Sequence, residues 1–97
     1  MLLAGFILLA TTLLHAEARK VVKRSSPEYP VLALRMRVEG TVKLIAEVDA
    51  GGNVREVRVV SGHPLLRPAA VGCLKKWKYE PGSEKTVEPV DFNFKLP

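Results

Sequence analysis

The sequence is poor in the residues that build metal sites and catalytic centres. It has one cysteine, Cys73, and two histidines among 97 residues. A lone cysteine cannot form an internal disulfide, and a structural zinc site needs about four nitrogen or sulfur ligands, so neither is predicted. In a helix at about 1.5 Å per residue, His63 and Cys73 would lie about 15 Å apart, whereas a nucleophile and its base need about 3 Å. We therefore expect no enzyme, no metal and no cofactor.

Charged side chains are absent from the first sixteen residues, MLLAGFILLATTLLHA. As a helix, the apolar run over residues 2–14 is about 20 Å long, shorter than the ~30 Å hydrocarbon core of a bilayer. Ala16-Glu17-Ala18 then supplies a small-x-small cleavage pattern. We predict that residues 1–18 are a signal peptide and that the mature, exported chain begins at Arg19. No Lys or Arg precedes the apolar run; an upstream start codon would explain this, and the alternative is then an inner-membrane anchor.

Acidic residues are outnumbered by basic ones. Beyond residue 18 the chain has 15 basic and 9 acidic side chains. Four of the basic residues lie at the start of the mature chain: Arg19, Lys20, Lys23 and Arg24. We interpret residues 19–26 as a solvated basic arm that suits anionic lipid headgroups. Nucleic acid is not expected as a partner, because the basic positions are not interleaved with exposed aromatic residues.

Residues 27–97 are interpreted as one domain that begins with a helix. Pro30 suits the first position of a helix, and Gly40 suits its end. The helix is predicted over Val31–Val38. Leu32 and Met36, four residues apart, are expected to face the core.

A β-hairpin is predicted next. Apolar and polar residues alternate over Thr41–Asp49, which indicates a strand with one buried face. Its inward residues are Val42, Leu44, Ala46 and Val48. The turn at Asp49–Asn53 contains two glycines that can adopt positive φ, so Val54–Ser61 is expected to return as the second strand.

A second helix is predicted over Leu65–Tyr79. Leu66, Ala70, Cys73 and Trp77 recur at spacings of four, three and four, which places them on one helical stripe facing the core. Cys73 and Trp77 are therefore interpreted as packing residues.

The last strand is predicted over Val90–Leu96. Inward Val90, Phe92, Phe94 and Leu96 alternate with outward Asp91, Asn93 and Lys95. Pro89 cannot donate to a ladder and is expected at the strand's start or on an edge, and Glu88 is expected at a solvated edge. A right-handed crossover through the second helix gives the strand order second, first, third. We predict a two-layer α+β fold: a three-stranded antiparallel sheet, order 2-1-3, with two helices on one face and the last strand on an edge.

Several motifs together resemble the C-terminal domain of TonB, the energy transducer of Gram-negative bacteria. They are Tyr-Pro at 29–30, Glu-Gly-Thr-Val at 39–42, Ser-Gly-His-Pro-Leu-Leu at 61–66 and Trp-Lys-Tyr-Glu-Pro at 77–81. The resemblance implies a fold of the TonB and TolA C-terminal type and a periplasmic location. It also implies that the domain grips the TonB box of an outer-membrane transporter as an added strand. A membrane-anchored form would add the energy-supplying partners ExbB and ExbD.

The resemblance and the edge position of the last strand give the candidate site. The edge strand contributes Val90, Asp91, Phe92, Asn93, Phe94, Lys95 and Leu96. An extended segment expected beside it contributes Ser26, Pro27, Glu28, Tyr29 and Pro30, because each proline restricts the residue before it. The alternative is an exported adaptor of the same fold that pairs with another chain, or with a second copy of itself as a homodimer, without energy coupling.

Overall fold

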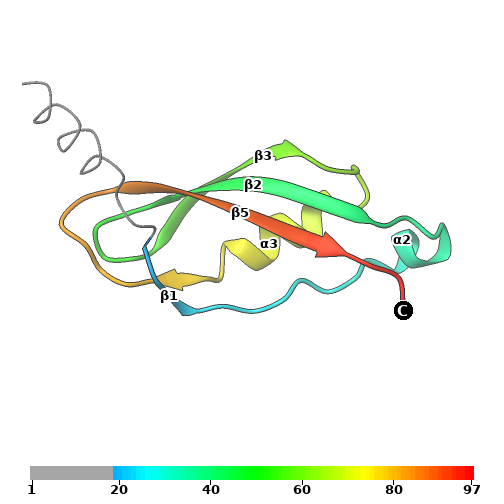
Figure 1. The fold of residues 1–97 in the computed structure, drawn as a ribbon, viewed down its shortest axis with the longest axis horizontal. Coiled ribbons are helices and arrows are strands. Elements are labelled where there is room, and N and C mark those ends of the chain that lie inside the picture. Colours follow the sequence, from blue (N-terminus) through cyan, green and yellow to red (C-terminus); the bar gives the residue numbers. More distant parts are fainter. Residues whose placement is uncertain (1–18) are drawn as a thin grey trace, which may run out of the picture.

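The structure is a computed structural model that describes residues 19–97 (Figure 1). The predicted signal peptide, residues 1–18, lies outside the described residues. In chain order the elements are β1 (Val21–Lys23), α2 (Val31–Arg35), β2 (Gly40–Val48), β3 (Val54–Ser61), α3 (Arg67–Leu74), β4 (Lys78–Tyr79) and β5 (Thr86–Phe94). Within this part of the chain, no helix has the length and apolar character needed to span a membrane.

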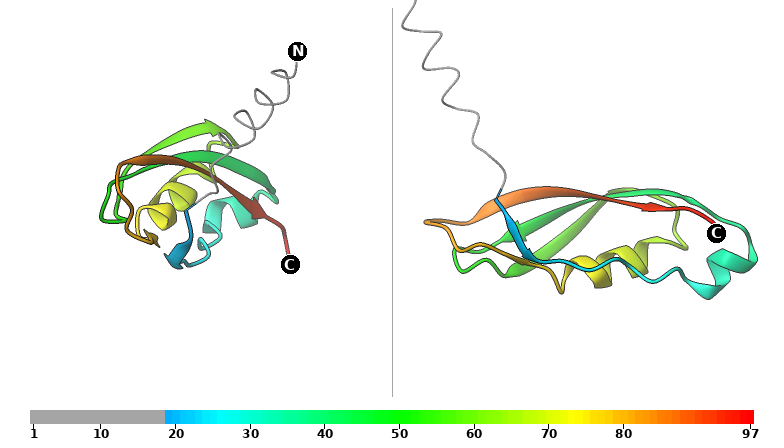
Figure 2. Two further views of the ribbon diagram at one scale, coloured as in Figure 1. Left: turned by 60° about the vertical axis from the view of Figure 1, so that its left-hand side comes forward. Right: turned by 60° about the horizontal axis from the view of Figure 1, so that its bottom comes forward.

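The main sheet has three antiparallel strands in the order β3-β2-β5. The predicted order, with the first hairpin strand in the centre and the last strand on an edge, is confirmed. Figures 1 and 2 place α3 under the middle of the sheet and α2 on the same side, at the end where β5 stops. The two-layer α+β fold is therefore also confirmed.

The hairpin of β2 and β3 follows from the sequence pattern. The inward residues of β2 are buried: Val42, Leu44, Ala46 and Val48. In the turn, the Gly52 amide donates to the Asp49 carbonyl at 3.0 Å, and Gly52 has φ of +91°. A Cβ on Gly52 would lie 2.0 Å from the carbonyl oxygen of Tyr79, so this turn also packs against β4.

The helix α3 is shorter than the predicted Leu65–Tyr79, which was wrong at its C-terminal end. Pro68 lies in the first turn and the helix ends at Leu74. Trp77 follows in a turn, where its amide donates to the Leu74 carbonyl at 3.1 Å. Leu66, Ala70, Cys73 and Trp77 all lie in the core cluster. The chain leaves the helix before Lys78 because Lys78 and Tyr79 pair with another segment.

That segment is the start of the described chain, within residues 19–26, for which a solvated basic arm was predicted. The interpretation was wrong for its middle, because β1 pairs antiparallel with β4 through Val21 opposite Tyr79 and Lys23 opposite Lys78. The Glu80 amide also donates to the Lys20 carbonyl at 2.9 Å. The basic residues around Val21 suggested a solvated segment, whereas Val21 is half-buried and packs against the core.

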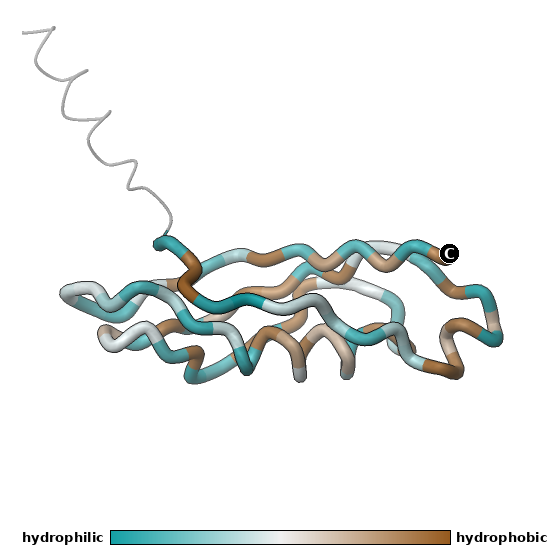
Figure 3. The backbone as a smooth tube through the Cα atoms, turned by 90° about the horizontal axis from the view of Figure 1, so that it is seen from below, coloured by the Kyte–Doolittle hydropathy of each residue, from teal (hydrophilic) through white to brown (hydrophobic). Residues whose placement is uncertain are grey.

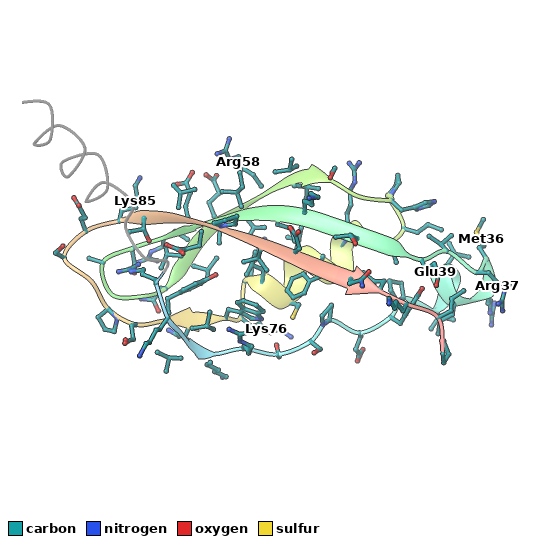
Figure 4. The ribbon with its side chains drawn as sticks, viewed as in Figure 1. Met36, Arg37, Glu39, Arg58, Lys76 and Lys85 are labelled. Atoms are coloured by element: carbon teal, nitrogen blue, oxygen red, sulfur yellow. The ribbon has the colours of Figure 1, made fainter. Side chains whose placement is uncertain are left out.

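The first helix, α2, was predicted over Val31–Val38 with Leu32 and Met36 facing the core. It ends at Arg35, and Leu32 and Met36 are 53% and 60% exposed. Only Ala33 of this helix is buried. Arg37 adopts a positive φ of +53°, which stops the helix, and Figure 4 shows Met36 and Arg37 at the tip of the molecule, directed away from the sheet.

The last strand begins four residues before the predicted Val90. β5 pairs with β2 from Thr86 opposite Val48 to Phe94 opposite Gly40, so Pro89 lies inside the strand and Lys95 and Leu96 lie beyond it. Glu88 is buried, not at a solvated edge. Of the two places expected for Pro89, the strand's start and an edge, the structure has the second: an edge strand accepts proline in its interior where the nitrogen faces outward.

Candidate peptide-binding edge

The outer edge of β5 has unpaired backbone groups. Among residues 19–97, the strand that pairs with β5 is β2. Pro89 has no N–H to give, so its backbone faces away from β2. Because backbone direction alternates along an antiparallel strand, Val87, Asp91 and Asn93 face the same outer edge. Their amides and carbonyls are available to an added strand.

The side chains of β5 alternate as the sequence predicted. Phe92 and Phe94 are buried, Val90 is half-buried, and Asp91 and Asn93 are exposed. On the exposed face, Asp91 lies 3.8 Å from the Lys43 ammonium and the Thr41 hydroxyl donates to the Asn93 side chain at 3.2 Å. Both contacts join β5 to β2, so these side chains are held to the sheet and remain open to solvent.

Past the strand, Lys95 is exposed and Leu96 is half-buried. The Leu96 amide donates to the Glu39 carboxylate at 3.0 Å, which fixes the end of β5 next to the start of β2. Figure 4 places Glu39 beside this end of the chain. The predicted edge residues beyond Phe94 are therefore not part of the ladder.

The predicted extended segment, residues 26–30, lies between β5 and α3, as the view from below shows (Figure 3). Its path is fixed at Ser25, whose carbonyl accepts hydrogen bonds from the Trp77 indole at 3.0 Å and the Cys73 thiol at 3.1 Å. Cys73 and Trp77 therefore pack in the core and also fix the position of this segment through their hydrogen bonds.

Tyr29 links the segment to the edge strand. Its ring meets that of Phe94 edge-to-face, with centroids 5.5 Å apart, and its hydroxyl donates to the Val38 carbonyl. Burial, together with the negative charge of Glu39, raises the pKa of the Tyr29 hydroxyl. Tyr29 is thus the part of the Tyr-Pro motif that reaches the β5 side of the molecule.

A groove of about 620 Å³ separates the extended segment from α3. The segment supplies one wall and α3, with the turn before it, supplies the other. The lining residues are Ser25, Ser26, Pro27, Glu28, Tyr29, Pro30, Val31, Leu65, Pro68, Ala69, Gly72, Cys73 and Lys76. All five predicted segment residues therefore line a groove, but its opposite wall is the helix and not the β5 edge.

A second pocket, of about 320 Å³, lies against the middle of β5, from Glu88 to Asp91. The Arg24 guanidinium sits 5.2 Å from the centre of the Trp77 ring, which packs edge-to-face on Phe92 at 5.5 Å. Burial and the charge of Glu88 raise the pKa of the Tyr79 hydroxyl, which Arg24 partly opposes. Sequence reasoning missed this pocket, since its walls come from the arm, from β4 and from β5.

The two residues first considered for catalysis lie in separate settings. His63 caps its own turn, where Nδ1 accepts a hydrogen bond from the Leu65 amide at 3.0 Å. Cys73 is a buried free thiol against Ser25. Among residues 19–97 no group of His, Cys, Asp and Glu side chains is arranged to hold a metal ion.

The sheet has a second free edge at β3. Val57 and Val59 of this strand are half-buried and pack against the core, whereas Val60 is 60% exposed. Figure 4 shows Arg58 pointing away from the α3 side of the sheet. This edge has none of the pocket-lining residues described above.

Residues 25–97 match the family described as "Gram-negative bacterial TonB protein C-terminal". The chain is 30% identical over 83 residues to Protein TonB of Escherichia coli strain K12, an alignment covering 84% of this chain and 35% of the relative. It is 45% identical over 76 residues to Protein tonB2 of Pseudomonas aeruginosa, covering 69% of this chain and 28% of the relative. The chain thus spans about a third of the length of these curated relatives.

The fold is similar to a solved one. The solution NMR structure of the Pseudomonas aeruginosa TonB CTD superposes with a TM-score of 0.67 at 23% sequence identity. The superposition covers 86% of this chain and 91% of that chain. At 23% identity, this similarity shows that the two chains share a fold.

Proposed function

Because this chain belongs to the family of Gram-negative bacterial TonB C-terminal domains, we propose that it binds the TonB box of an outer-membrane transporter. The bound peptide adds a strand to the outer edge of β5, and the domain thereby takes part in energy-dependent transport across the outer membrane. The family is one of transport energy transducers, and the proposal includes no catalytic step.

One observation carries the proposal: β5 is an edge strand whose outward backbone groups at Val87, Asp91 and Asn93 have no partner strand among residues 19–97. Strand addition draws its affinity from such main-chain groups and its specificity from alternate side chains. An added strand loses one hydrogen bond opposite Pro89, because proline has no amide hydrogen. We therefore expect the peptide to pair best from Asp91 onward.

The surface beneath the edge supports this choice of strand. Side chains on the inner face of the added peptide would point toward the pocket that Arg24, Trp77 and Val90 line. Those on the outer face would lie beside Asp91 and Asn93, which are exposed. The extended segment at Ser26–Pro30 contributes through Tyr29, which contacts Phe94 of the same strand.

The location and further partners follow from the same proposal. The protein acts in the periplasm, after removal of residues 1–18 as a signal peptide. If those residues are retained as an inner-membrane anchor, the domain would work with ExbB and ExbD. Fractionation of a Gram-negative host that expresses the full chain separates these cases, because a retained Met1 form would be recovered in membranes.

Titration with a synthetic TonB-box peptide, followed by backbone amide chemical shifts, tests the site. The largest changes are expected at Asp91 and Asn93, while Val57 and Val59 on the opposite edge stay nearly unchanged. A scrambled peptide of equal composition is the control. If Val57 and Val59 move most, the peptide adds to β3 and the site proposed on β5 is wrong.

The second candidate is an adaptor that pairs through β3, and the exposed edge residue Val60 is the observation in its favour. Such a module would bind another envelope protein, or a second copy of itself, without energy coupling. Capture by purified outer-membrane transporters favours the first function. Concentration-dependent dimers without transporter binding favour the second.

A further inference from the structure

Glu88 is the one buried charged side chain in the described part of the chain, at 7% exposure. It lies on the inner face of β5, opposite Ala46 of β2. No Lys or Arg side chain of residues 19–97 comes within 4.0 Å of its carboxylate in an ion pair. The Glu88 side chain lines the pocket under β5 together with Arg24. A carboxylate of such low exposure is stabilised by a cationic group in direct contact with it, so a cation placed at Glu88 would stabilise the fold.

Within residues 19–97, the hydrogen-bond donor that reaches the Glu88 carboxylate is the backbone nitrogen of Arg19, 3.4 Å from Oε1. This distance exceeds the usual range of about 2.7–3.2 Å for an amide donor, so the present contact is weak. A charged nitrogen makes shorter and stronger hydrogen bonds to a carboxylate, at about 2.7–2.9 Å. An ammonium group at the Arg19 nitrogen would therefore bind the Glu88 carboxylate more strongly than the amide does.

Arg19 is held firmly in this place. Its guanidinium donates to the Asp49 carbonyl at 2.8 Å, the Ala50 carbonyl at 3.3 Å and the Thr86 hydroxyl at 3.3 Å. The guanidinium passes over Gly82, where an added Cβ would lie 2.6 Å from Nη2. These contacts do not depend on what precedes Arg19, so its main-chain nitrogen stays at Glu88 whether or not the chain continues.

The same nitrogen forms the peptide bond that follows the sequence Ala16-Glu17-Ala18. We infer that Glu88 is a binding site for the free α-ammonium group of Arg19, produced when a leader peptidase cleaves between Ala18 and Arg19. Hydrolysis leaves a carboxylate on Ala18, and the released Arg19 amine takes up a proton to become an ammonium ion. The buried Glu88 then has its cationic partner, and β1 is tied to β5 as well as to β4.

Processing thus stabilises the folded domain. Before cleavage, the buried carboxylate faces a neutral amide. After cleavage, an ion pair joins the first residue of the chain to the strand proposed to bind the peptide. The inference rests on the cleavage proposed above but not on peptide binding, so the two can fail separately.

The first experiment determines the cleavage point. The full chain is expressed in a Gram-negative host, and the N-terminus of the periplasmic form is sequenced. We expect Arg19 as the first residue. A mature form that begins at any other residue would overturn the inference, because its α-ammonium group would not lie at Glu88.

The second experiment compares two chains released from a fusion partner by a specific protease, one beginning at Arg19 and one at Ala18. Both keep every residue of the hydrophobic core. In denaturant unfolding, the folded-to-unfolded ratio of the form that begins at Arg19 is expected to be about tenfold higher than that of the form that begins at Ala18. A difference of this size is typical of the interaction between two residues in direct contact. Equal stability of the two wild-type forms would overturn the inference, even if no Glu88 variant folds.

Glu88→Gln, made in both forms, isolates the ion pair. It should lower the folded-to-unfolded ratio about tenfold in the form that begins at Arg19 and about twofold or less in the Ala18 form. Glu84→Gln, at an exposed acid just before β5, is the matched control and should leave both ratios unchanged. If Glu88→Gln costs the same in both forms, Glu88 serves the fold without recognising the α-ammonium group.

Discussion

The two edges of the sheet, β5 and β3, are alike in their free backbone groups and differ in what lies beneath them. Under β5, the rings of Trp77 and Tyr29 pack edge-to-face on Phe92 and Phe94, and a pocket opens beside them. β3 contributes half-buried valines to the core, but none of its residues lines either of the two pockets described above. An edge supplies hydrogen bonds to any strand, whereas an adjoining pocket can select side chains. The difference favours β5 as the recognition edge.

The largest expected effect comes from removing the support beneath β5. Trp77→Ala should lower the free energy of unfolding by about 3–5 kcal/mol, because it deletes a buried aromatic side chain and leaves a cavity. The Ser25 carbonyl also loses its indole donor. Denaturant unfolding measures the loss, and hydrogen exchange should speed up more in β5 than in β3. Trp77→Phe, which keeps most of the packing, should cost less; a loss below about 1 kcal/mol for the alanine variant would contradict the core role of Trp77.

Next in size is the loss of one backbone donor from the β5 edge. Asn93→Pro removes an outward amide and should weaken binding of the TonB-box peptide about tenfold, since a net hydrogen bond contributes about 0.5–1.5 kcal/mol. Asn93→Ala keeps the amide and is the matched control. Isothermal titration calorimetry measures both. Equal affinities of the two variants would mean that the peptide does not pair with this amide.

A smaller effect is expected from acid at the turn that joins β2 to β3. The Asn53 amide donates to Asp49 at 2.9 Å and the Arg55 guanidinium lies 2.8 Å from its other oxygen, which together hold the pKa of Asp49 below its ordinary value. A lowered pKa stabilises the fold above the unfolded value of about 3.9, and this stability is lost as pH falls through the folded value. Asp49→Asn should therefore show a weaker decline in stability below about pH 4 than the wild type, by urea unfolding at stepped pH. Identical pH profiles would contradict this role of Asp49.

The smallest effect is expected on the β3 edge. Val60→Lys places a charge on an exposed position and should change the free energy of unfolding by no more than about 0.5 kcal/mol. Peptide affinity should also stay unchanged, because β5 is the proposed edge. Sedimentation of the wild type and the variant measures whether each is a monomer or a dimer. A wild-type dimer that Val60→Lys disrupts would show that β3 serves self-association and would favour the adaptor function.

The alternation of apolar and polar residues was sufficient to predict the three main strands, and the right-handed crossover rule then gave their order. Val42, Leu44, Ala46 and Val48 are buried as their period of two indicates, and the glycines at the turn allowed the hairpin. The stripe from Leu66 to Trp77 was likewise enough to place Cys73 and Trp77 in the core. These features depend on local geometry, in which each residue's direction follows from its neighbours along the chain.

Features made by segments far apart in the sequence were decided only by the tertiary structure. Leu32 and Met36 had helical spacing, but α2 lies at the end of the sheet and leaves them exposed. Val21–Lys23, in the basic segment at the start of the described chain, forms a strand because it pairs with Lys78 and Tyr79. Glu88 has the polarity of a surface residue, yet the course of the chain near Arg19 covers it. The burial of a residue depends on which segments pack over it. A local sequence pattern does not show which distant segment will pack there.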